Sequence, residues 1–235
     1  MRKFLNGPWV LLMPTLIILT CVVLLPLLLS LWTSFTPFKL TKPDTLYRFV
    51  GFRNYERLIG DFDFWVAFGR TVLFLAIALN LELIFGLGIA LLINKITYGQ
   101  RTLRTLMMFP MMFSPILVGF QWKYIFNDNI GLLNNFLREF GVIQPIPWLV
   151  DGILANISIM AAEIWSSTSV FAILLLAGLL GIPKDPIEAA KVDGCNSWQV
   201  FKNITLPFLM PFVFIAMTIR SLDVARAYDI VQMMT

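Results

Sequence analysis

The sequence predicts an all-α membrane protein, a bundle of helices that crosses the lipid bilayer several times. Of its 235 residues, 58% are hydrophobic and only 14% are charged, and the mean hydropathy is +0.80. Soluble domains carry about 25% charged residues, so this chain has too little polar surface to cover a water-soluble core. Several apolar stretches also reach the roughly 18 residues that a helix needs to span a bilayer. We therefore expect a single transmembrane domain over residues 1–235.

Five apolar stretches are interpreted as membrane spans, although the fifth is short. The first follows Arg2 and Lys3, as a signal peptide would, but it is long and has no A-x-A cleavage site. We therefore interpret it as a retained span that contains Pro14 and Pro26. The predicted spans cover residues 10–31, 64–93, 106–126, 153–180 and 208–222.

The segment between the third and fourth spans carries a short amphipathic pattern. Its apolar residues share one helical face, which predicts a helix lying on the membrane surface. Gly141 is expected to end this helix. The residues of that face are Leu132, Leu133, Phe136, Leu137 and Phe140.

The residue types that are missing exclude several kinds of site. The chain has no histidine, which excludes imidazole metal ligands and histidine-based catalysis. It has no GxxxxGK[ST] motif, so it has no nucleotide phosphate-binding loop of its own, and we expect it to bind no cofactor. Cys21 and Cys195 are too far apart in the sequence to form a redox motif. The basic residues form no block, so a nucleic-acid partner is not predicted.

The most polar loop of the second half, residues 181–207, predicts a helical hairpin. Pro183 and Pro186 end the fourth span and start a short helix, because proline is tolerated in a first turn. Asp193-Gly194 is a turn signal. Asn196 or Ser197 is the expected N-cap of a second helix, with Trp198, Phe201 and Thr205 near one face. Pro207 is expected to open the fifth span. Such a hairpin has the form of a docking element for a groove on another protein.

This loop resembles the EAA signature of permease subunits of ABC importers. The chain has the string EAA-x2-DG-C-x5-F-x2-I-x-LP, with Cys195 where the family has alanine. The matching positions are Glu188, Ala189, Ala190, Asp193, Gly194, Phe201, Ile204, Leu206 and Pro207. The resemblance implies that this loop couples the permease to its ATPase.

Further motifs, in the same order along the chain, resemble the carbohydrate type of these permeases. They are Val50-Gly51-Phe52-x-Asn54-Tyr55, Gly131-x2-Asn134, Trp148-Leu149 and the segment Arg220-Ser221-Leu222-Asp223-x2-Arg226-x-Tyr228-Asp229. The resemblance implies a type I importer transmembrane domain that takes up a sugar, polyol or glycerol phosphate and is itself no enzyme. It implies a second, homologous permease subunit, two ATPase subunits that bind ATP and magnesium, and an extracytoplasmic solute-binding protein.

The orientation in the membrane follows only weakly from charge. With the N-terminus inside, eight Lys and Arg residues fall on inner segments and six on outer loops. The resemblance implies that the EAA loop faces the cytoplasm of a bacterial or archaeal cell. The N-terminus is then also cytoplasmic, in a multi-pass protein of the cytoplasmic (inner) membrane.

Polar residues inside the fourth span are candidates for the substrate path, because ionisable groups in a span usually face protein or water. Two interpretations stay open: the polar stripe binds sugar hydroxyls, or Glu163 pairs with a cation of the partner permease. Trp165 could stack on a sugar ring. In the second span, Asn80 and Glu82 are two residues apart and cannot share a face, so we favour a structural role. The stripe comprises Asn156, Glu163, Ser166, Ser167 and Ser169.

Two other functions are compatible with a membrane bundle. An ion-coupled secondary transporter would use Glu82 and Glu163 as proton carriers and would work without an ATPase. An intramembrane enzyme is disfavoured, since no pair of catalytic residues is recognisable.

The resemblance also bears on the end of the chain. The resembled permeases end inside the cell after a sixth span, whereas five spans from a cytoplasmic N-terminus place Thr235 outside. We therefore expect the transmembrane domain to lack its last helix in this sequence. A natural five-span permease is the alternative.

Overall fold

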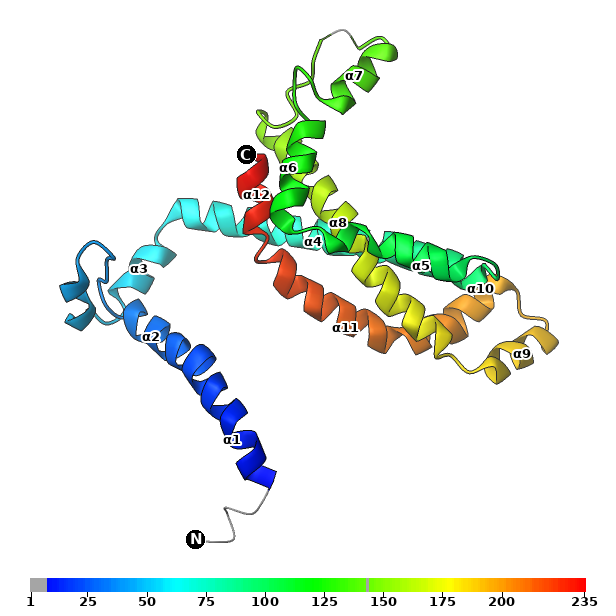
Figure 1. Cartoon of the computed structure of the whole chain (residues 1–235), viewed down its shortest axis with the longest axis horizontal. Coiled ribbons are helices and arrows are strands. Elements are labelled where there is room, and N and C mark those ends of the chain that lie inside the picture. The colour runs from blue at the N-terminus through cyan, green and yellow to red at the C-terminus, as the bar shows by residue number, and fades with distance from the viewer. Residues whose placement is uncertain (1–7, 143) are drawn as a thin grey trace. The chain divides into compact units, whose positions relative to one another are not determined.

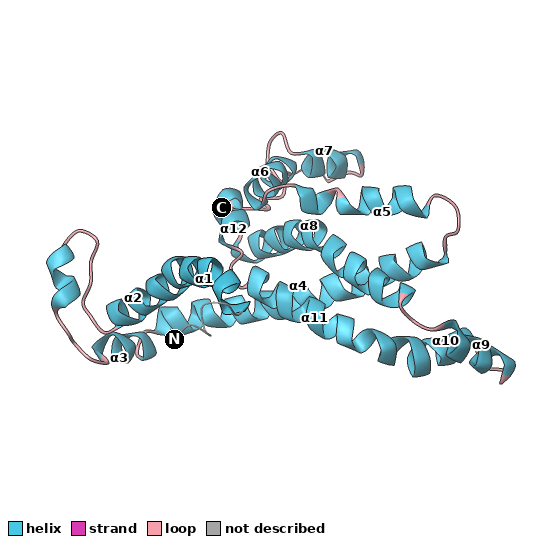
Figure 2. Ribbon diagram, turned by 60° about the horizontal axis from the view of Figure 1, so that its bottom comes forward, coloured by secondary structure: helices cyan, strands magenta, loops and turns pink. Residues whose placement is uncertain are grey.

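The computed structural model describes residues 8–142 and 144–235. Within these ranges the chain consists of helices and connecting loops and contains no strand (Figure 2). The all-α prediction is confirmed. Arg2 and Lys3, which contributed to the predicted orientation, lie outside the described residues.

The chain divides into two compact units, with the boundary between Gly69 and Arg70 inside the long helix α4 (Phe62–Lys95). The single transmembrane domain expected from the sequence stays a prediction. The first unit contains α1 (Pro8–Leu19), the π-helical turn η1 (Thr20–Leu24), α2 (Leu25–Ser34), the 3-10 turn η2 (Pro43–Tyr47) and α3 (Arg53–Ile59).

The first span forms one apolar helical run over Leu11–Ser34. Its π-helical turn directly precedes Pro26, where the backbone N–H of Leu25 donates to the carbonyl of Thr20. Proline lacks an N–H and its ring crowds the carbonyl four residues before it, and a widened turn relieves this conflict. The large apolar side chains of this run are exposed, as lipid-facing side chains are.

The Gly-Phe-x-Asn-Tyr motif holds the loop that follows the first span. The Asn54 amide donates to the carbonyls of Ser34 and Thr36, at 2.8 Å each, and the Tyr55 hydroxyl donates to the Ser34 hydroxyl at 2.7 Å. Gly51 has a φ of 61°, a conformation that favours glycine. The motif thus ties the start of α3 to the end of α2.

The third predicted span, residues 106–126, is not one straight helix, and this expectation needs correction. The chain bends by 89° between the run Gln100–Met112 and α6 (Pro115–Ile125). Two prolines interrupt the ladder of backbone hydrogen bonds here, since proline donates none. The side chain of Ser114 then caps α6 by accepting from the backbone N–H of Leu117 at 3.4 Å. The first run comprises α5 (Gln100–Met108) and the 3-10 turn η3 (Pro110–Met112).

The amphipathic segment forms helix α7 (Leu132–Glu139), as predicted, and Gly141 follows its end with a φ of 91°. Asn134 is buried and holds the return of the chain: its carbonyl oxygen accepts from the indole N–H of Trp148 at 2.9 Å and from the backbone of Ile146 at 3.2 Å. A Cβ on Gly131 would lie 2.1 Å from the carbonyl oxygen of Asn127, so only glycine fits there. The Gly-x2-Asn and Trp motifs are therefore parts of one structural unit.

Helix α8 (Gly152–Leu180) is the centre of the second unit and contributes to each of its three apolar clusters. Two close approaches depend on glycine. A Cβ on Gly86 of α4 would lie 2.5 Å from Cβ of Phe171, and one on Gly178 would lie 2.8 Å from the ring of Phe212. Small residues at such contacts let membrane helices pack closely.

The predicted hairpin is present, but its second helix runs directly into the fifth span. One continuous helical run covers Ser197–Val224, so Pro207 does not open a separate helix. The π-helical turn before Pro207 accommodates the proline, with the backbone N–H of Leu206 donating to the carbonyl of Phe201. The elements are α9 (Lys184–Val192), α10 (Ser197–Val200), η4 (Phe201–Thr205), α11 (Leu206–Val224) and α12 (Tyr228–Met234).

Four helices of the described chain are long and apolar enough to cross a membrane, and the bent pair of α5–η3 and α6 would be a fifth. Within the second unit, the α9–α10 hairpin lies at one end of α8, and α12 packs on α6 and α8 towards the other end (Figure 1). The hairpin and the α12 end of the unit are therefore carried by opposite ends of the same long helix.

Candidate functional site

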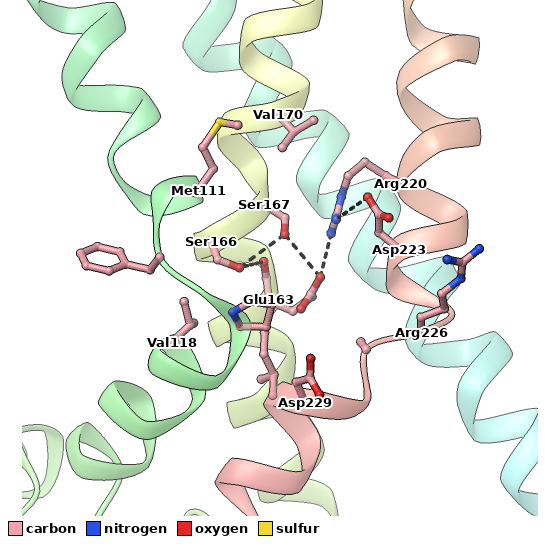
Figure 3. Close-up of a pocket in the computed structure, with 14 residues that line it drawn as sticks. Met111, Val118, Glu163, Ser166, Ser167, Val170, Arg220, Asp223, Arg226 and Asp229 are labelled. Atoms are coloured by element: carbon pink, nitrogen blue, oxygen red, sulfur yellow. Dashed lines mark hydrogen bonds and ion pairs between the residues drawn. The ribbon is translucent and has the colours of Figure 1, made fainter. Parts of the chain in front are cut away.

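A cavity of about 360 Å³ lies among η3, α6, α8, α11 and α12 of the second unit. Its wall combines apolar residues of η3 and α6 with polar and charged residues of α8, α11 and the segment leading into α12 (Figure 3). At 1.5 Å per residue, Glu163 lies roughly 16 Å along α8 from its first residue, which is within the apolar span. The polar lining residues are Glu163, Ser166, Ser167, Arg220, Asp223, Arg226 and Asp229.

The guanidinium of Arg220 is the centre of a buried ion-pair network. Its Nε and Nη2 donate to the two carboxylate oxygens of Glu82, at 3.1 and 3.2 Å. Nη2 also donates to Oε1 of Glu163 at 2.7 Å, and Nη1 to Oδ2 of Asp223 at 3.4 Å. The Glu82 side chain is fully buried and that of Arg220 is 7% exposed. The network therefore joins α4, α8 and α11, with the two-pronged geometry that arginine forms with carboxylates.

Glu163 has its ion-pair partner within this chain. Its Oε1 accepts from Arg220 and also from the hydroxyl of Ser167 at 3.3 Å, one helical turn further along α8. Because α11 packs on α8, it brings Arg220 to Glu163 as a cation of the same chain. The interpretation in which Glu163 pairs with a cation of a second permease stays a prediction. In the described chain, Oε2 of Glu163 has no hydrogen-bond partner.

The structure divides the predicted polar stripe among different surroundings. Glu163, Ser166 and Ser167 line the same cavity. The Asn156 amide donates to the carbonyl of Gly152, and its side chain lines a neighbouring cavity of about 350 Å³ with Arg70 and Arg226. Ser169 does not reach the first cavity, since its hydroxyl donates to the carbonyl of Met107 at 2.6 Å.

Trp165 lies on another side of α8. Two residues from Glu163 along a helix correspond to a rotation of about 200°, which points the indole away from the carboxylate. Its ring stacks on Phe113 and meets Trp122 edge-on, with centroids 6.5 and 5.9 Å away. It lines a separate groove together with Phe85 and Met107. The structure thus does not bring Trp165 together with Glu163 and Ser167.

The pairing of Glu82 with Arg220 was not predicted from the sequence, where Arg220 was noted only within a motif. A signal was present: charged residues of alternating sign recur every third position at the end of the fifth span. They are Arg220, Asp223, Arg226 and Asp229, and all four line the cavity.

At the other end of the unit, backbone geometry closes the hairpin. The N–H of Cys195 donates to the carbonyl of Ala190 at 2.9 Å and that of Gly194 to the carbonyl of Lys191 at 3.2 Å, the two bonds of a Schellman motif. Gly194 has a φ of 82°, as this motif requires. Asn196 caps the next helix and forms a reciprocal capping box with Gln199.

The predicted coupling residues differ in exposure. Ala190 is buried and Phe201 is half-buried, stacked on the exposed Trp198 with ring centroids 5.6 Å apart. Between the hairpin and the ends of α4 and α8 lies a cavity of about 590 Å³. Ala190 and Phe201 are therefore withdrawn from solvent to different degrees, whereas the other predicted coupling residues are not. The exposed positions are Glu188, Ala189, Asp193 and Gly194.

Similar proteins include two curated permeases. The chain is 34% identical over 223 residues to "Probable ABC transporter permease protein y4oQ" of Sinorhizobium fredii, covering 95% of this chain and 72% of that protein. It is 35% identical over 230 residues to "Trehalose/maltose transport system permease protein MalF" of Thermococcus litoralis, covering 97% and 76%.

The fold is also similar to a solved structure. A chain of the bacterial alginate ABC transporter in complex with alginate pentasaccharide-bound periplasmic protein matches with a TM-score of 0.77 and 22% identity, over 93% of this chain and 73% of that one. The family described as "Binding-protein-dependent transport system inner membrane component" matches residues 82–235, which include the cavity and the hairpin. These findings confirm the resemblance to ABC-importer permeases, and the chain belongs to this family of binding-protein-dependent transport system inner membrane components.

Proposed function

We propose that the chain is a permease subunit of an ATP-driven importer and forms half of the pathway for a sugar, a polyol or a similar carbohydrate. The observation that carries this proposal is the arrangement of α8 and α11: a polar cavity lies within their membrane-spanning part, and a capped hairpin projects from their far end. A relative named for trehalose and maltose transport supports the carbohydrate class.

In the cavity, Glu163 and Ser167 are the groups that we expect to meet the solute. Ligand sites fix orientation with a few polar groups on a mostly apolar wall. Oε2 of Glu163 and the hydroxyl of Ser167 can accept hydrogen bonds from sugar hydroxyls, while Val118 and Phe113 supply apolar surface. Asn156 lines the adjoining cavity, which shares Arg226 with the first. We expect Asn156 to contact the solute at a different stage of its passage from Glu163 and Ser167.

At the hairpin, we expect Glu188, Ala189 and the Asp193-Gly194 turn to dock on an ATPase subunit, with Ala190 and Phe201 holding the hairpin to the bundle. ATP and magnesium would bind to two such subunits and not to this chain. A second permease would complete the pathway, and a solute-binding protein would deliver the solute, in the way that a periplasmic protein bound to alginate pentasaccharide accompanies the similar alginate transporter. In this arrangement the hairpin and the N-terminus face the cytoplasm, and the chain lies in the cytoplasmic membrane.

An ion-coupled transporter is less well supported. Such a carrier needs carboxylates that exchange protons with water, whereas Glu82 is fully buried and both its oxygens accept from Arg220. The family assignment also favours the ATP-driven mechanism.

The coupling role is tested in proteoliposomes that contain this chain, its partner permease, the ATPase subunits and the binding protein. Glu188→Lys should abolish most ATP-driven uptake of maltose or trehalose, used as probes, and most stimulation of ATP hydrolysis by the loaded binding protein. Glu139→Lys on α7 makes the same charge change on an exposed helix at the other end and should leave both activities unchanged. Normal uptake by Glu188→Lys would contradict the proposal.

The substrate path is tested by two serines of α8. Ser167→Ala removes a hydroxyl that lines the cavity and should raise the solute concentration for half-maximal uptake several-fold. Ser169→Ala removes a hydroxyl bonded to the backbone of Met107, so it should lower stability without changing this concentration. Equal effects of the two changes on apparent affinity would remove Ser167 from the pathway.

A further inference from the structure

The Glu82–Arg220–Glu163 network also bears on which solutes enter the cavity. Resting on the proposed function, we propose that this network makes the cavity select uncharged polyhydroxy solutes over anionic ones. Arg220 is the group that an anionic sugar would otherwise seek, because a guanidinium matches carboxylate and phosphate geometry. Its bonds to the chain's own carboxylates withhold it from the solute.

The nitrogens of Arg220 are already committed. Nε and Nη2 bind Glu82, Nη2 also binds Glu163, and Nη1 faces Asp223. Arg220 lines the cavity, but its side chain is buried, so an anion that binds it from the cavity side must compete with Glu163 and Asp223 for the Nη1 and Nη2 groups. Displacing Glu163 would leave a carboxylate without its partner inside the membrane, which is strongly unfavourable.

The fixed charges around the cavity favour the same selection. The lining contains the carboxylates of Glu163, Asp223 and Asp229 and the guanidinium groups of Arg220 and Arg226. With Glu82 behind Arg220, four carboxylates face two guanidinium groups, which leaves an excess of two negative charges when all are ionised. At the short distances within a cavity of this size, this excess repels an anion.

An uncharged sugar or polyol meets no such repulsion. Its hydroxyls donate hydrogen bonds, and Oε2 of Glu163 is an acceptor without a partner in the described chain. The hydroxyls of Ser166 and Ser167 stand beside it and line the same wall (Figure 3). The cavity therefore offers acceptors to hydroxyl groups beside an arginine, Arg220, that is already bound to carboxylates. The other arginine of the lining, Arg226, has no ion pair in the described chain and also lines the neighbouring cavity with Asn156.

A change at Glu82 tests the electrostatic effect of the network without altering a residue that contacts the solute. It binds Arg220 from α4 but does not line the cavity, so it acts as a positioning residue through Arg220. Glu82→Gln removes one negative charge and releases part of the guanidinium without altering the wall that the solute touches. Glu163→Gln makes the same change on the cavity wall itself.

The test uses the assembled membrane complex in nanodiscs without the binding protein, so that the binding protein's own selectivity does not enter. Binding of methyl α-glucoside and methyl α-glucuronoside, which differ by one carboxylate, is measured by saturation-transfer NMR. The parent should bind the glucoside more tightly than the glucuronoside. In Glu82→Gln and Glu163→Gln the ratio of association constants, glucuronoside over glucoside, should rise roughly tenfold or more, the effect of one charge about 10 Å away at a protein-like dielectric.

Two further variants keep the test decisive. Asp223→Asn removes an exposed carboxylate from the same network, so it preserves folding and should raise the ratio in the same direction by a smaller factor. Asp185→Asn removes one negative charge at the hairpin end and should leave the ratio unchanged. Equal binding of both probes by the parent, or an unchanged ratio in Glu82→Gln and Asp223→Asn, overturns the inference alone. Failure of the parent to bind or transport any neutral sugar overturns the proposed function and the inference with it.

Discussion

Near one end of helices α8 and α11, Glu82, Glu163 and Arg220 are buried and bound to one another, whereas the charged side chains of the hairpin at the other end are exposed. Arg220 lies against two carboxylates from two other helices, and its side chain is 7% exposed. At the hairpin, Glu188 and Asp193 are exposed, and no ion pair links them to the described chain.

The difference reflects the surroundings of each end. Inside a membrane a charge must find its partner within the protein, so side-chain bonds between distant segments hold the cavity together. The exposed hairpin has no ion pair in the described chain, and its shape follows from local backbone rules: a Schellman motif at Gly194 and a capping box at Asn196. The cavity is thus organised by tertiary contacts and the hairpin by its own sequence, which leaves the hairpin's charges free for a partner.

The largest effect on stability is expected when Arg220 is replaced. Arg220→Met leaves Glu82 and Glu163 as unpaired buried carboxylates, which should cost about 3–5 kcal/mol and release α4 from α8 and α11. Thermal unfolding of the purified chain in detergent, followed by its tryptophan fluorescence, measures the loss. Arg226→Met is the matched control, because Arg226 is exposed and has no ion pair in the described part of the chain. Equal stability of the two variants would show that the network does not hold the helices.

The close packing of α4 on α8 beside the ion-pair network should also contribute to stability. Gly86 lies one turn from Glu82, and a Cβ there would come within 2.5 Å of Cβ of Phe171 and 3.0 Å of the backbone of Ala172. Gly86→Ala should therefore push the two helices apart and lower the free energy of unfolding by about 1–3 kcal/mol. Gly88→Ala has nothing within 4 Å and should be neutral or slightly stabilising, since alanine favours helix. Thermal unfolding of the pair distinguishes a packing contact from a general intolerance of alanine.

At the hairpin end, the expected effect is on coupling. Gly194→Val forces a β-branched residue into a left-handed conformation, a local strain of about 1–3 kcal/mol that should disturb the turn. We expect ATP-driven uptake and stimulated ATP hydrolysis to fall together while the chain stays folded. Gly141→Val imposes the same strain at the end of α7, in equally open surroundings, and should leave coupling intact. If both variants lose coupling to the same degree, the strain acts generally and not through the hairpin.

Features set by the local sequence could be predicted, whereas features set by tertiary contacts could not. The spans come from the length of apolar runs, and the Asp-Gly turn and the cap at residues 196–197 come from rules that act within a few residues. The structure keeps the turn, assigns the cap to Asn196 and not to Ser197, and keeps the spans except that the third is bent and the fifth continues from the hairpin. The shape of the hairpin is therefore largely predictable from its local sequence.

The cavity is not predictable in the same way. The partners Glu82, Glu163 and Arg220 are separated by 57 and 138 residues in the pairs that bind, and no local rule connects them. The bend between α5 and α6 also depends on how its two prolines are accommodated in the bundle, which apolar length alone does not reveal. Helical geometry could have separated Trp165 from Glu163, because two residues turn a side chain by about 200°.

The smallest expected effect concerns the capping box, and it tests whether local rules alone shape the hairpin. Asn196→Ala removes the bond at 2.9 Å from the backbone N–H of Gln199 and, indirectly, the return bond at 2.8 Å from the backbone of Asn196 to the Gln199 side chain. The start of the α10–α11 run should lose about 1 kcal/mol, seen as faster amide hydrogen exchange over its first turn. Asn196→Ser should keep most of the protection from exchange, because serine caps nearly as well. Ser197→Ala, at the next position, should leave the exchange rate unchanged. Uptake should fall only slightly, since Gly194 still sets the turn. If Ser197→Ala increases exchange as much as Asn196→Ala, the helix begins through a different cap and the hairpin depends on its surroundings more than its local sequence indicates.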